Sequence, residues 1–324
     1  MVSASATRMK AAAIQLPSER SGHAPSEDLA QRRAGLAAAI AQGVWRTDPP
    51  PQEVVIGAVR TLRFDPPGPS RGLLVHRHGG AFRIGAPETV APFASALARR
   101  CRVSVICPAY RLAPEHPFPA ALVDGMAVID ALRDRTEIPL IVSGDSAGGG
   151  LAASLSALVT AQDRLLAGLA LLSPWLDLTV TSVTYEKNAT TDPLFSRVAA
   201  SEAAQLYLQG VSPNHPLASP LFGSVSGLPP AFVNVGAGEV LAADSWEYHA
   251  ALCKAGIAAD LQVIPGMEHV AVTRGVDLPG AAETFEAMAC FIENALAKAP
   301  TRHDASATAQ PNGAGPVASG RGSS

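Results

Sequence analysis

The sequence predicts an α/β fold, in which helices cover both faces of a mostly parallel eight-stranded sheet. Two observations lead to this prediction. Short apolar runs of strand length alternate with longer segments of helical pattern, and clusters of Gly and Pro separate them. The expected strands are residues 53–56, 59–64, 72–76, 103–107, 140–142, 169–173, 231–235 and 259–264. The first two follow each other closely, which predicts an antiparallel start to the sheet.

The expected helices lie mostly between these strands, at residues 26–42, 89–100, 120–135, 147–159, 197–208, 240–255 and 281–297. The first begins at Ser26, a capping residue that two acidic residues follow. Four prolines within residues 108–119 predict a long rigid loop. Residues 175–227 interrupt the alternation, and we expect this insertion to lie over the strand ends.

Composition bounds the class of protein. Apolar residues make up 48% of the 324 residues, which indicates a globular chain with a large core. The formal net charge of −3 argues against a nucleic-acid partner held by a basic surface. The four cysteines are isolated and form no metal-binding pair, so we expect free thiols in a reducing compartment. The apolar run at 11–16 is too short for a signal peptide, and no membrane-spanning stretch is present, so a cytoplasmic location is expected.

We expect one domain at residues 25–299. Residues 1–24 are predicted to be poorly ordered, and the polar composition of residues 300–324 predicts a disordered tail.

Ser146 stands at the centre of the most informative stretch, residues 139–159. An apolar strand is followed by a glycine-rich turn, and an alanine- and leucine-rich helix follows the turn. A serine at the apex of such a turn has its hydroxyl clear of the backbone. Gly144 and Gly148 flank it, where the strained turn leaves no room for a β-carbon. The pattern alone also fits a plain glycine turn, so a histidine, an acid and an oxyanion hole are needed to support a nucleophile.

A second glycine turn, residues 78–82, follows the strand at 72–76 and can supply the oxyanion hole. Backbone N–H groups of Gly79, Gly80 and Ala81 would point at a developing negative charge, together with the N–H of Ala147. His76 and His78 lie near the same strand end, but no third ligand is close in sequence. We therefore expect no metal site and no cofactor.

His269 is the best candidate for the general base, because it lies in the loop directly after the last strand and can reach over the sheet. The other histidines fit this role less well, since they lie within a helix, the insertion, the proline loop or the tail: His249, His215, His116 and His303.

Glu239 is the favoured acid, on the loop after the strand at 231–235. Asp244 is the alternative, although a helix from Val240 would carry it away from the strand end. The acid would fix the tautomer of His269 and stabilise its protonated form. The chain order of serine, acid and histidine is that of the α/β-hydrolase sheet.

Three motifs resemble those of the hormone-sensitive-lipase-like carboxylesterases, the bacterial family IV of the α/β-hydrolases. They are HGGAF at 78–82, YRLAPE at 110–115 with PFPA downstream, and GDSAGG at 144–149. The resemblance covers about residues 25–298 and implies the triad and oxyanion hole given above. It also implies a helical cap from residues 25–45 and 177–227. Two positions depart from the family pattern: Ala81 replaces the usual third glycine, and Glu239 stands where aspartate is common.

The resemblance implies a serine carboxylesterase for short- to medium-chain esters, with an acyl-enzyme on Ser146. The same triad would serve a lactonase or an N-deacetylase, and a non-catalytic ligand-binding receptor is a further alternative on this fold. The expected partner is a small-molecule ester, with neither nucleic acid nor membrane, and the sequence leaves open whether the chain forms a homodimer.

Overall fold

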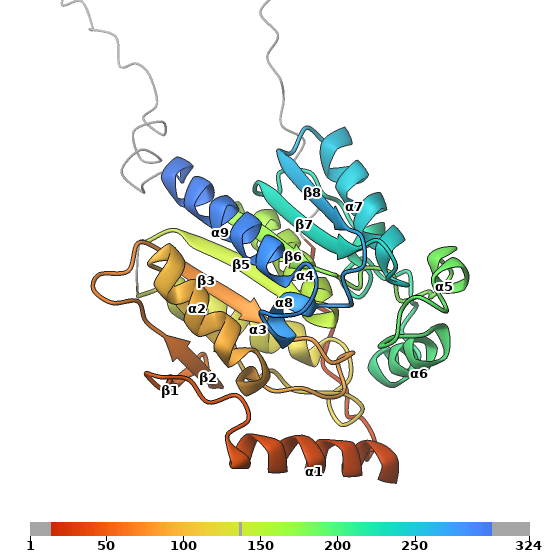
Figure 1. Cartoon of the computed structure of the whole chain (residues 1–324). Helices are drawn as coiled ribbons and strands as arrows, with labels where there is room; N and C mark the ends of the chain where they lie inside the picture. Colours follow the sequence, from red (N-terminus) through yellow and green to blue (C-terminus); the bar gives the residue numbers. More distant parts are fainter. Residues whose placement is uncertain (1–13, 136–137, 300–324) are drawn as a thin grey trace, which may run out of the picture.

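Eight strands form one sheet in the order β1-β2-β4-β3-β5-β6-β7-β8 in the computed structural model, which describes residues 14–135 and 138–299 (Figure 1). The strands are β1 (Gln52–Ile56), β2 (Val59–Phe64), β3 (Leu73–Arg77), β4 (Ser104–Pro108), β5 (Leu140–Asp145), β6 (Gly168–Leu172), β7 (Ala231–Gly236) and β8 (Ala259–Ile264). β2 pairs antiparallel with both β1 and β4, and the remaining pairs are parallel. The predicted α/β fold, with its antiparallel start, is confirmed.

Helices cover both faces of the sheet. One face packs against α2 (Ala91–Cys101) and α9 (Ala281–Lys298), and the other against α3 (Ala120–Arg133), α4 (Ala147–Ala161) and α7 (Ala242–Lys254). Every residue of the four central strands is buried, because parallel strands between two helical layers have no solvent face. The carboxyl ends of these strands therefore emerge from a rigid core, and the loops there are well supported.

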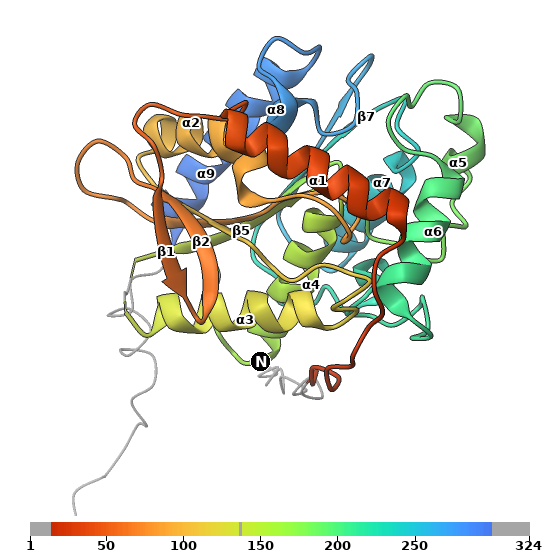
Figure 2. The same cartoon turned by 90° about the horizontal axis from the view of Figure 1, so that it is seen from below.

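Three helices lie beyond the carboxyl ends of the strands, toward which the arrowheads of β3 and β7 point in Figure 1. They are α1 (Glu27–Gln42), α5 (Thr184–Lys187) and α6 (Arg197–Leu208), and Figure 2 shows α1 crossing the molecule on this side. Leu29 is the only buried residue of α1. Polar contacts hold the helix instead: Arg33 pairs with Glu115 and donates to the carbonyl of Arg83 at 2.8 Å.

Residues 14–24 differ from the prediction of a poorly ordered N-terminus. They run without helix or strand, and side chains tie them to the domain. Arg20 donates to the carbonyl of Leu208 at 2.7 Å, and Glu19 pairs with Arg111 at 2.6 Å. These partners are distant in sequence, so no local pattern reveals them. The rest of the predicted N-terminal segment, 1–13, and the predicted tail, 300–324, lie outside the described residues.

Other helix boundaries differ slightly from the predictions. A 3-10 turn, η1 (Pro87–Val90), precedes α2, and α7 begins at Ala242 rather than at residue 240. The short elements α5, α8 (Ala271–Arg274) and η2 (Pro220–Phe222) carry no periodicity that a sequence pattern could show. No helix among the described residues is both long and apolar enough to cross a bilayer.

Candidate active site

Ser146 occupies a sharp turn between β5 and α4. Its backbone lies at φ 53° and ψ −123°, a conformation that costs a non-glycine residue on the order of 1–3 kcal/mol. A β-carbon on Gly144 would lie 2.1 Å from the carbonyl oxygen of Gly148, and one on Gly148 would lie 2.1 Å from that of Arg77. Both glycines are therefore required for the close approach of strand and helix, as the sequence predicts.

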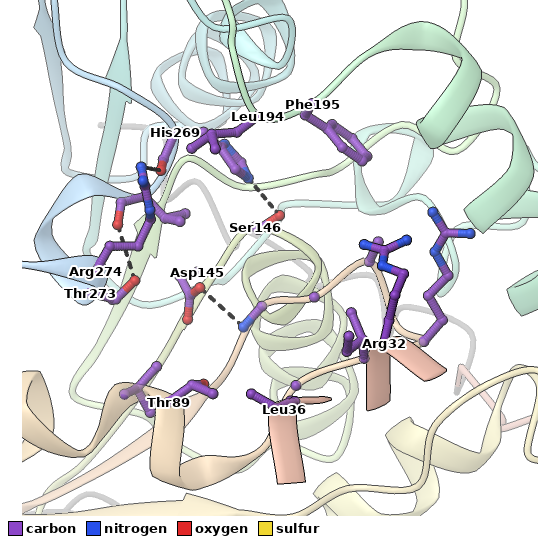
Figure 3. A pocket seen from close by; sticks show the side chains of 18 of the residues that line it. Arg32, Leu36, Thr89, Asp145, Ser146, Leu194, Phe195, His269, Thr273 and Arg274 are labelled. Carbon is purple, nitrogen blue, oxygen red and sulfur yellow. Dashed lines mark hydrogen bonds between the residues drawn. The ribbon is translucent and has the colours of Figure 1, made fainter. Parts of the chain in front are cut away.

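His269 joins Ser146 to Glu239. Its Nε2 lies 2.9 Å from the Ser146 hydroxyl (Figure 3). Its Nδ1 lies 2.6 Å from Glu239 Oε2. An ionised carboxylate only accepts hydrogen bonds, so Nδ1 carries the proton and Nε2 accepts from the hydroxyl. The three side chains are buried and come from the loops after β5, β7 and β8. The structure thus brings together the three residues that the sequence singles out.

Glu239 is held by two further donors. The backbone N–H of Gly236 donates to its Oε1 at 2.6 Å, and the hydroxyl of Ser173 donates to the same atom at 2.7 Å. The Ser173 hydroxyl also accepts from the N–H of Val270, the neighbour of His269. Ser173 therefore links the acid loop to the histidine loop. Sequence reasoning missed this role, although Ser173 closes the predicted strand 169–173 at the same edge of the sheet.

The charge of Glu239 sets the proton affinity of His269. Burial disfavours the charged imidazolium and by itself would lower the pKa of His269. The hydrogen bond and the negative charge of Glu239 outweigh burial, so the pKa of His269 lies above its usual value. A raised pKa makes the ring a stronger base toward the Ser146 hydroxyl.

Asp244 lies in the first turn of α7, where it holds a different loop. Its Oδ2 accepts from the N–H groups of Leu176 and Asp177 at 2.8 and 3.0 Å. Burial raises the pKa of this carboxyl to about 8, despite these two hydrogen bonds. Glu239, and not Asp244, contacts His269.

One predicted oxyanion donor of the glycine turn after β3 already has an acceptor. The N–H of Gly79 donates to Asp145 Oδ2 at 3.0 Å. The other oxygen of Asp145 bonds to Nε2 of His76 at 3.1 Å. An oxyanion would have to compete with Asp145, 66 residues along the chain, for the N–H of Gly79, whose role as a donor stays a prediction.

Three of the predicted donors remain. Among the described residues, the N–H groups of Gly80 and Ala81 have no hydrogen-bond partner. Ala147 is the first residue of α4, where N–H groups lack acceptors within the helix. Gly80 and Ala81 both have positive φ, 113° and 53°. Alanine tolerates the second value at a small cost, so its replacement of glycine is compatible with the turn.

His78 braces this turn. Its Nδ1 donates to the carbonyl of Gly79 at 2.8 Å, and its ring stacks on Tyr110 with centroids 4.3 Å apart. The Tyr110 hydroxyl donates to the carbonyl of His78 at 2.7 Å. Burial lowers the pKa of His78 to about 4, so the ring stays neutral near pH 7.

A cavity of about 560 Å³ opens above Ser146, and residues from α1, the glycine turn, the insertion and α8 line it (Figure 3). Its apolar lining consists mainly of Leu36, Trp45, Ile84, Val90, Leu194 and Phe195. The ring of Phe195 is nearly parallel to that of His269, with centroids 6.0 Å apart. The insertion therefore reaches the candidate base itself.

Polar side chains of the insertion also hold the loop that carries Glu239. Asn188 donates to the backbone carbonyl of Glu239 at 2.7 Å. The hydroxyl of Thr184 donates to the backbone carbonyl of Val240 at 2.6 Å. Thr191 donates to the carbonyl of Gly238 at 2.8 Å. Sequence reasoning assigned these residues no role, because such short polar side chains are equally common in solvated turns.

A serine, a histidine and an acid in hydrogen-bonded order, beside unpaired N–H groups, form the arrangement that hydrolysis of an acyl compound requires. Fold and site together define an α/β hydrolase. The family profile described as alpha/beta hydrolase fold matches residues 74–273, and the chain belongs to this family.

Relatives narrow the class to carboxylic ester hydrolases of the hormone-sensitive-lipase type. An acetyl-hydrolase of Streptomyces hygroscopicus is 34% identical over 250 residues, which cover 76% of this chain and 84% of the relative. An esterase of Acinetobacter venetianus is 39% identical over 199 residues, 60% of this chain and 66% of the relative. A solved structure, described as an esterase from the bacterial hormone-sensitive lipase family, superposes with a TM-score of 0.79 at 30% identity, covering 84% of this chain and 93% of its own.

Proposed function

We propose that this protein is a serine carboxylesterase that hydrolyses short- to medium-chain esters through an acyl-enzyme on Ser146. The observation that carries the proposal is a continuous chain of two hydrogen bonds. It runs from the Ser146 hydroxyl to His269 at 2.9 Å and from His269 to Glu239 at 2.6 Å. This geometry lets the proton move from the Ser146 hydroxyl to Nε2 of His269 without any rearrangement of the side chains.

In the first half of the reaction, the Ser146 oxygen attacks the ester carbonyl while His269 takes the hydroxyl proton. The carbonyl oxygen becomes an oxyanion, which the N–H groups of Gly80, Ala81 and Ala147 stabilise. Removal of one such donor typically costs about 2.7–4 kcal/mol of transition-state stabilisation. His269 then gives its proton to the departing alcohol, and the acyl group remains on Ser146.

In the second half, water enters in place of the alcohol. His269 takes a proton from this water as its oxygen attacks the acyl carbon, and the acid leaves as Ser146 regains its proton. Glu239 remains ionised and stabilises the imidazolium in both halves.

The cavity supports the substrate class. A volume of about 560 Å³ with a mostly apolar lining accommodates a short- or medium-chain ester. The name of the Streptomyces relative, acetyl-hydrolase, supports acetyl esters as one group of substrates.

The test is a panel of p-nitrophenyl esters of graded acyl length, with one lactone and one N-acetyl compound, given to the wild type and to Ser146→Ala. We expect turnover of short esters that Ser146→Ala abolishes, and labelling of Ser146 by a fluorophosphonate. Turnover that survives Ser146→Ala would refute the assignment of Ser146 as the nucleophile. Faster turnover of the lactone or the amide than of any ester would show that esters are not the preferred substrate class. No turnover of any compound would favour a ligand-binding receptor.

A further inference from the structure

The cavity above Ser146 has an unusual charge for a site that takes neutral esters. Three arginines line it, from three separate segments: Arg32 on α1, Arg83 after the glycine turn, and Arg274 on α8. Among the described lining residues the only acidic one is Asp145, and its two oxygens bond to His76 and Gly79. Glu202 pairs with Arg83 and Glu268 pairs with Arg274, so among the described residues Arg32 is the one lining arginine without a carboxylate partner.

Arg32 is the arginine that structural contacts leave available. It has no hydrogen bond or ion pair within residues 14–135 and 138–299, and its side chain extends from α1 into the cavity, across from Arg274 (Figure 3). Neighbouring arginines of the N-terminal segment are tied to the domain: Arg20 to backbone carbonyls and Arg33 to Glu115. Attachment of α1 therefore does not depend on Arg32.

Arg83 is a second cation at the cavity, and its ion-pair partner is a solvent-exposed carboxylate. Its side chain is only 6% exposed, and it pairs at 2.9 Å with Glu202, whose side chain on α6 is 59% exposed. The hydrogen bond from Arg33 to the carbonyl of Arg83 places α1 beside this segment. A bound carboxylate can thus interact with Arg32 and with N–H groups of Arg83 that Glu202 leaves unused.

We propose that the substrates favoured by this site are esters that also carry a carboxylate, such as monoesters of dicarboxylic acids, and that Arg32 is the residue that selects them. This inference rests on the proposed esterase function. The reaction is unchanged: water cleaves the ester bond to give an acid and an alcohol, while the second carboxylate stays intact and binds the guanidinium group. Charge attraction across a partly enclosed site also raises the association rate of an anionic substrate.

The experiment compares esters that differ only in a carboxylate. Monoethyl glutarate is paired with ethyl valerate, and 3-acetoxypropanoate with propyl acetate, so that the carboxylate lies on the acyl side or on the alcohol side. The kcat/KM of each is measured for the wild type, Arg32→Gln and Arg46→Gln. Arg46→Gln is the matched control, because Arg46 is a cation of the same N-terminal segment that does not line the cavity.

We expect the wild type to prefer at least one carboxylate ester over its neutral counterpart. In Arg32→Gln this preference falls about 3- to 10-fold, mainly through KM, and in Arg46→Gln it does not change. Raising the salt concentration lowers the preference of the wild type. Equal preference in the wild type and Arg32→Gln would overturn the inference, as would faster hydrolysis of the neutral ester in both pairs. If no ester is hydrolysed in a Ser146-dependent way, the proposed function itself fails, which is a distinct result.

Discussion

Asp192 accepts a hydrogen bond at 2.9 Å from the backbone N–H of Val240, the residue that follows Glu239. Its other oxygen accepts from the N–H groups of Leu194 and Phe195, which line the cavity. One buried carboxylate therefore fixes both the loop of the proposed triad acid and a wall of the substrate site. The insertion therefore helps to position the candidate catalytic groups as well as lining the cavity beside them.

Asp192→Asn tests this relationship. An amide has only one acceptor oxygen, so its NH₂ group would face a backbone N–H and displace either the Val240 loop or the 194–195 segment. We expect kcat/KM for short esters to fall about 10-fold or more, a loss of on the order of 1.5–3 kcal/mol. Glu186→Gln is the control, since Glu186 is an exposed carboxylate of the same insertion that pairs with Arg197. Equal activity of the two variants would contradict the positioning role of Asp192.

The pH profile tests the pairing of Glu239 with His269. Only the neutral ring accepts the serine proton, and the pKa of His269 is raised, so activity of the wild type should fall as the pH drops through a value above 6.5. Glu239→Gln removes the negative charge that raises this pKa. We expect its acid limb to move to lower pH and its kcat to fall by about 10³- to 10⁴-fold. An acid limb at an unchanged pH would show that another group sets it.

Asp244→Asn, unlike Glu239→Gln, should leave the activity almost unchanged. Asparagine presents the same acceptor oxygen to the N–H groups of Leu176 and Asp177, so we expect kcat to stay within about twofold of the wild type. Loss of activity comparable to that of Glu239→Gln would show that the acid is misassigned.

Stability measurements separate Asp244 from the triad in a second way. Its carboxyl keeps a proton in the folded state up to a pKa of about 8, whereas the unfolded chain releases it near 3.8. The unfolded state thus binds fewer protons in this window, and the free energy of unfolding decreases as pH rises through it. We expect the Tm of Asp244→Asn to rise relative to that of the wild type between about pH 5 and 8. A constant difference in Tm would contradict the raised pKa.

Gly148→Ala tests the close packing of the serine turn. The new β-carbon would lie 2.1 Å from the Arg77 carbonyl oxygen, so the turn must open, and we expect loss of activity with a destabilisation of at least about 1–3 kcal/mol. Gly35→Ala is the matched control, because Gly35 lies within α1 and a β-carbon added there would have no other atom within 4 Å. We expect a gain of about 0.5–1 kcal/mol there, measured by urea unfolding. Full activity of Gly148→Ala would refute the steric argument.

The sequence predicts the residues whose position follows from topology. Ser146, Glu239 and His269 each follow a parallel strand, and the ends of such strands meet at one edge, so pattern and chain order suffice. The choice between Glu239 and Asp244 follows from the same reasoning, since a helix of known start carries Asp244 away. The four central strands are predictable because burial on both faces leaves apolar runs between turns.

Other features depend on pairs of residues that topology does not determine. The hydrogen bond from the N–H of Gly79 to Asp145 is one of them, because it is set by side-chain orientation. Ser173 and Asp192 act through hydrogen bonds across 66 and 48 residues, and their short polar side chains are also typical of ordinary turns. Arg32 has an unremarkable position on an alanine-rich helix, and only the fold shows that the helix borders a cavity.

The attachment of residues 14–42 has a consequence for the order in which the protein assembles during synthesis. This segment leaves the ribosome before the rest of the described domain, but Arg20 binds the carbonyls of Leu208 and Gln209, and Arg33 binds Glu115. Its docking is complete only when all of those residues have emerged, 189 positions later for the bond from Arg20 to Gln209. A nascent chain that ends before Leu208 therefore lacks the carbonyls that bind Arg20, although the partners of Arg33 and Glu19 have already been synthesised.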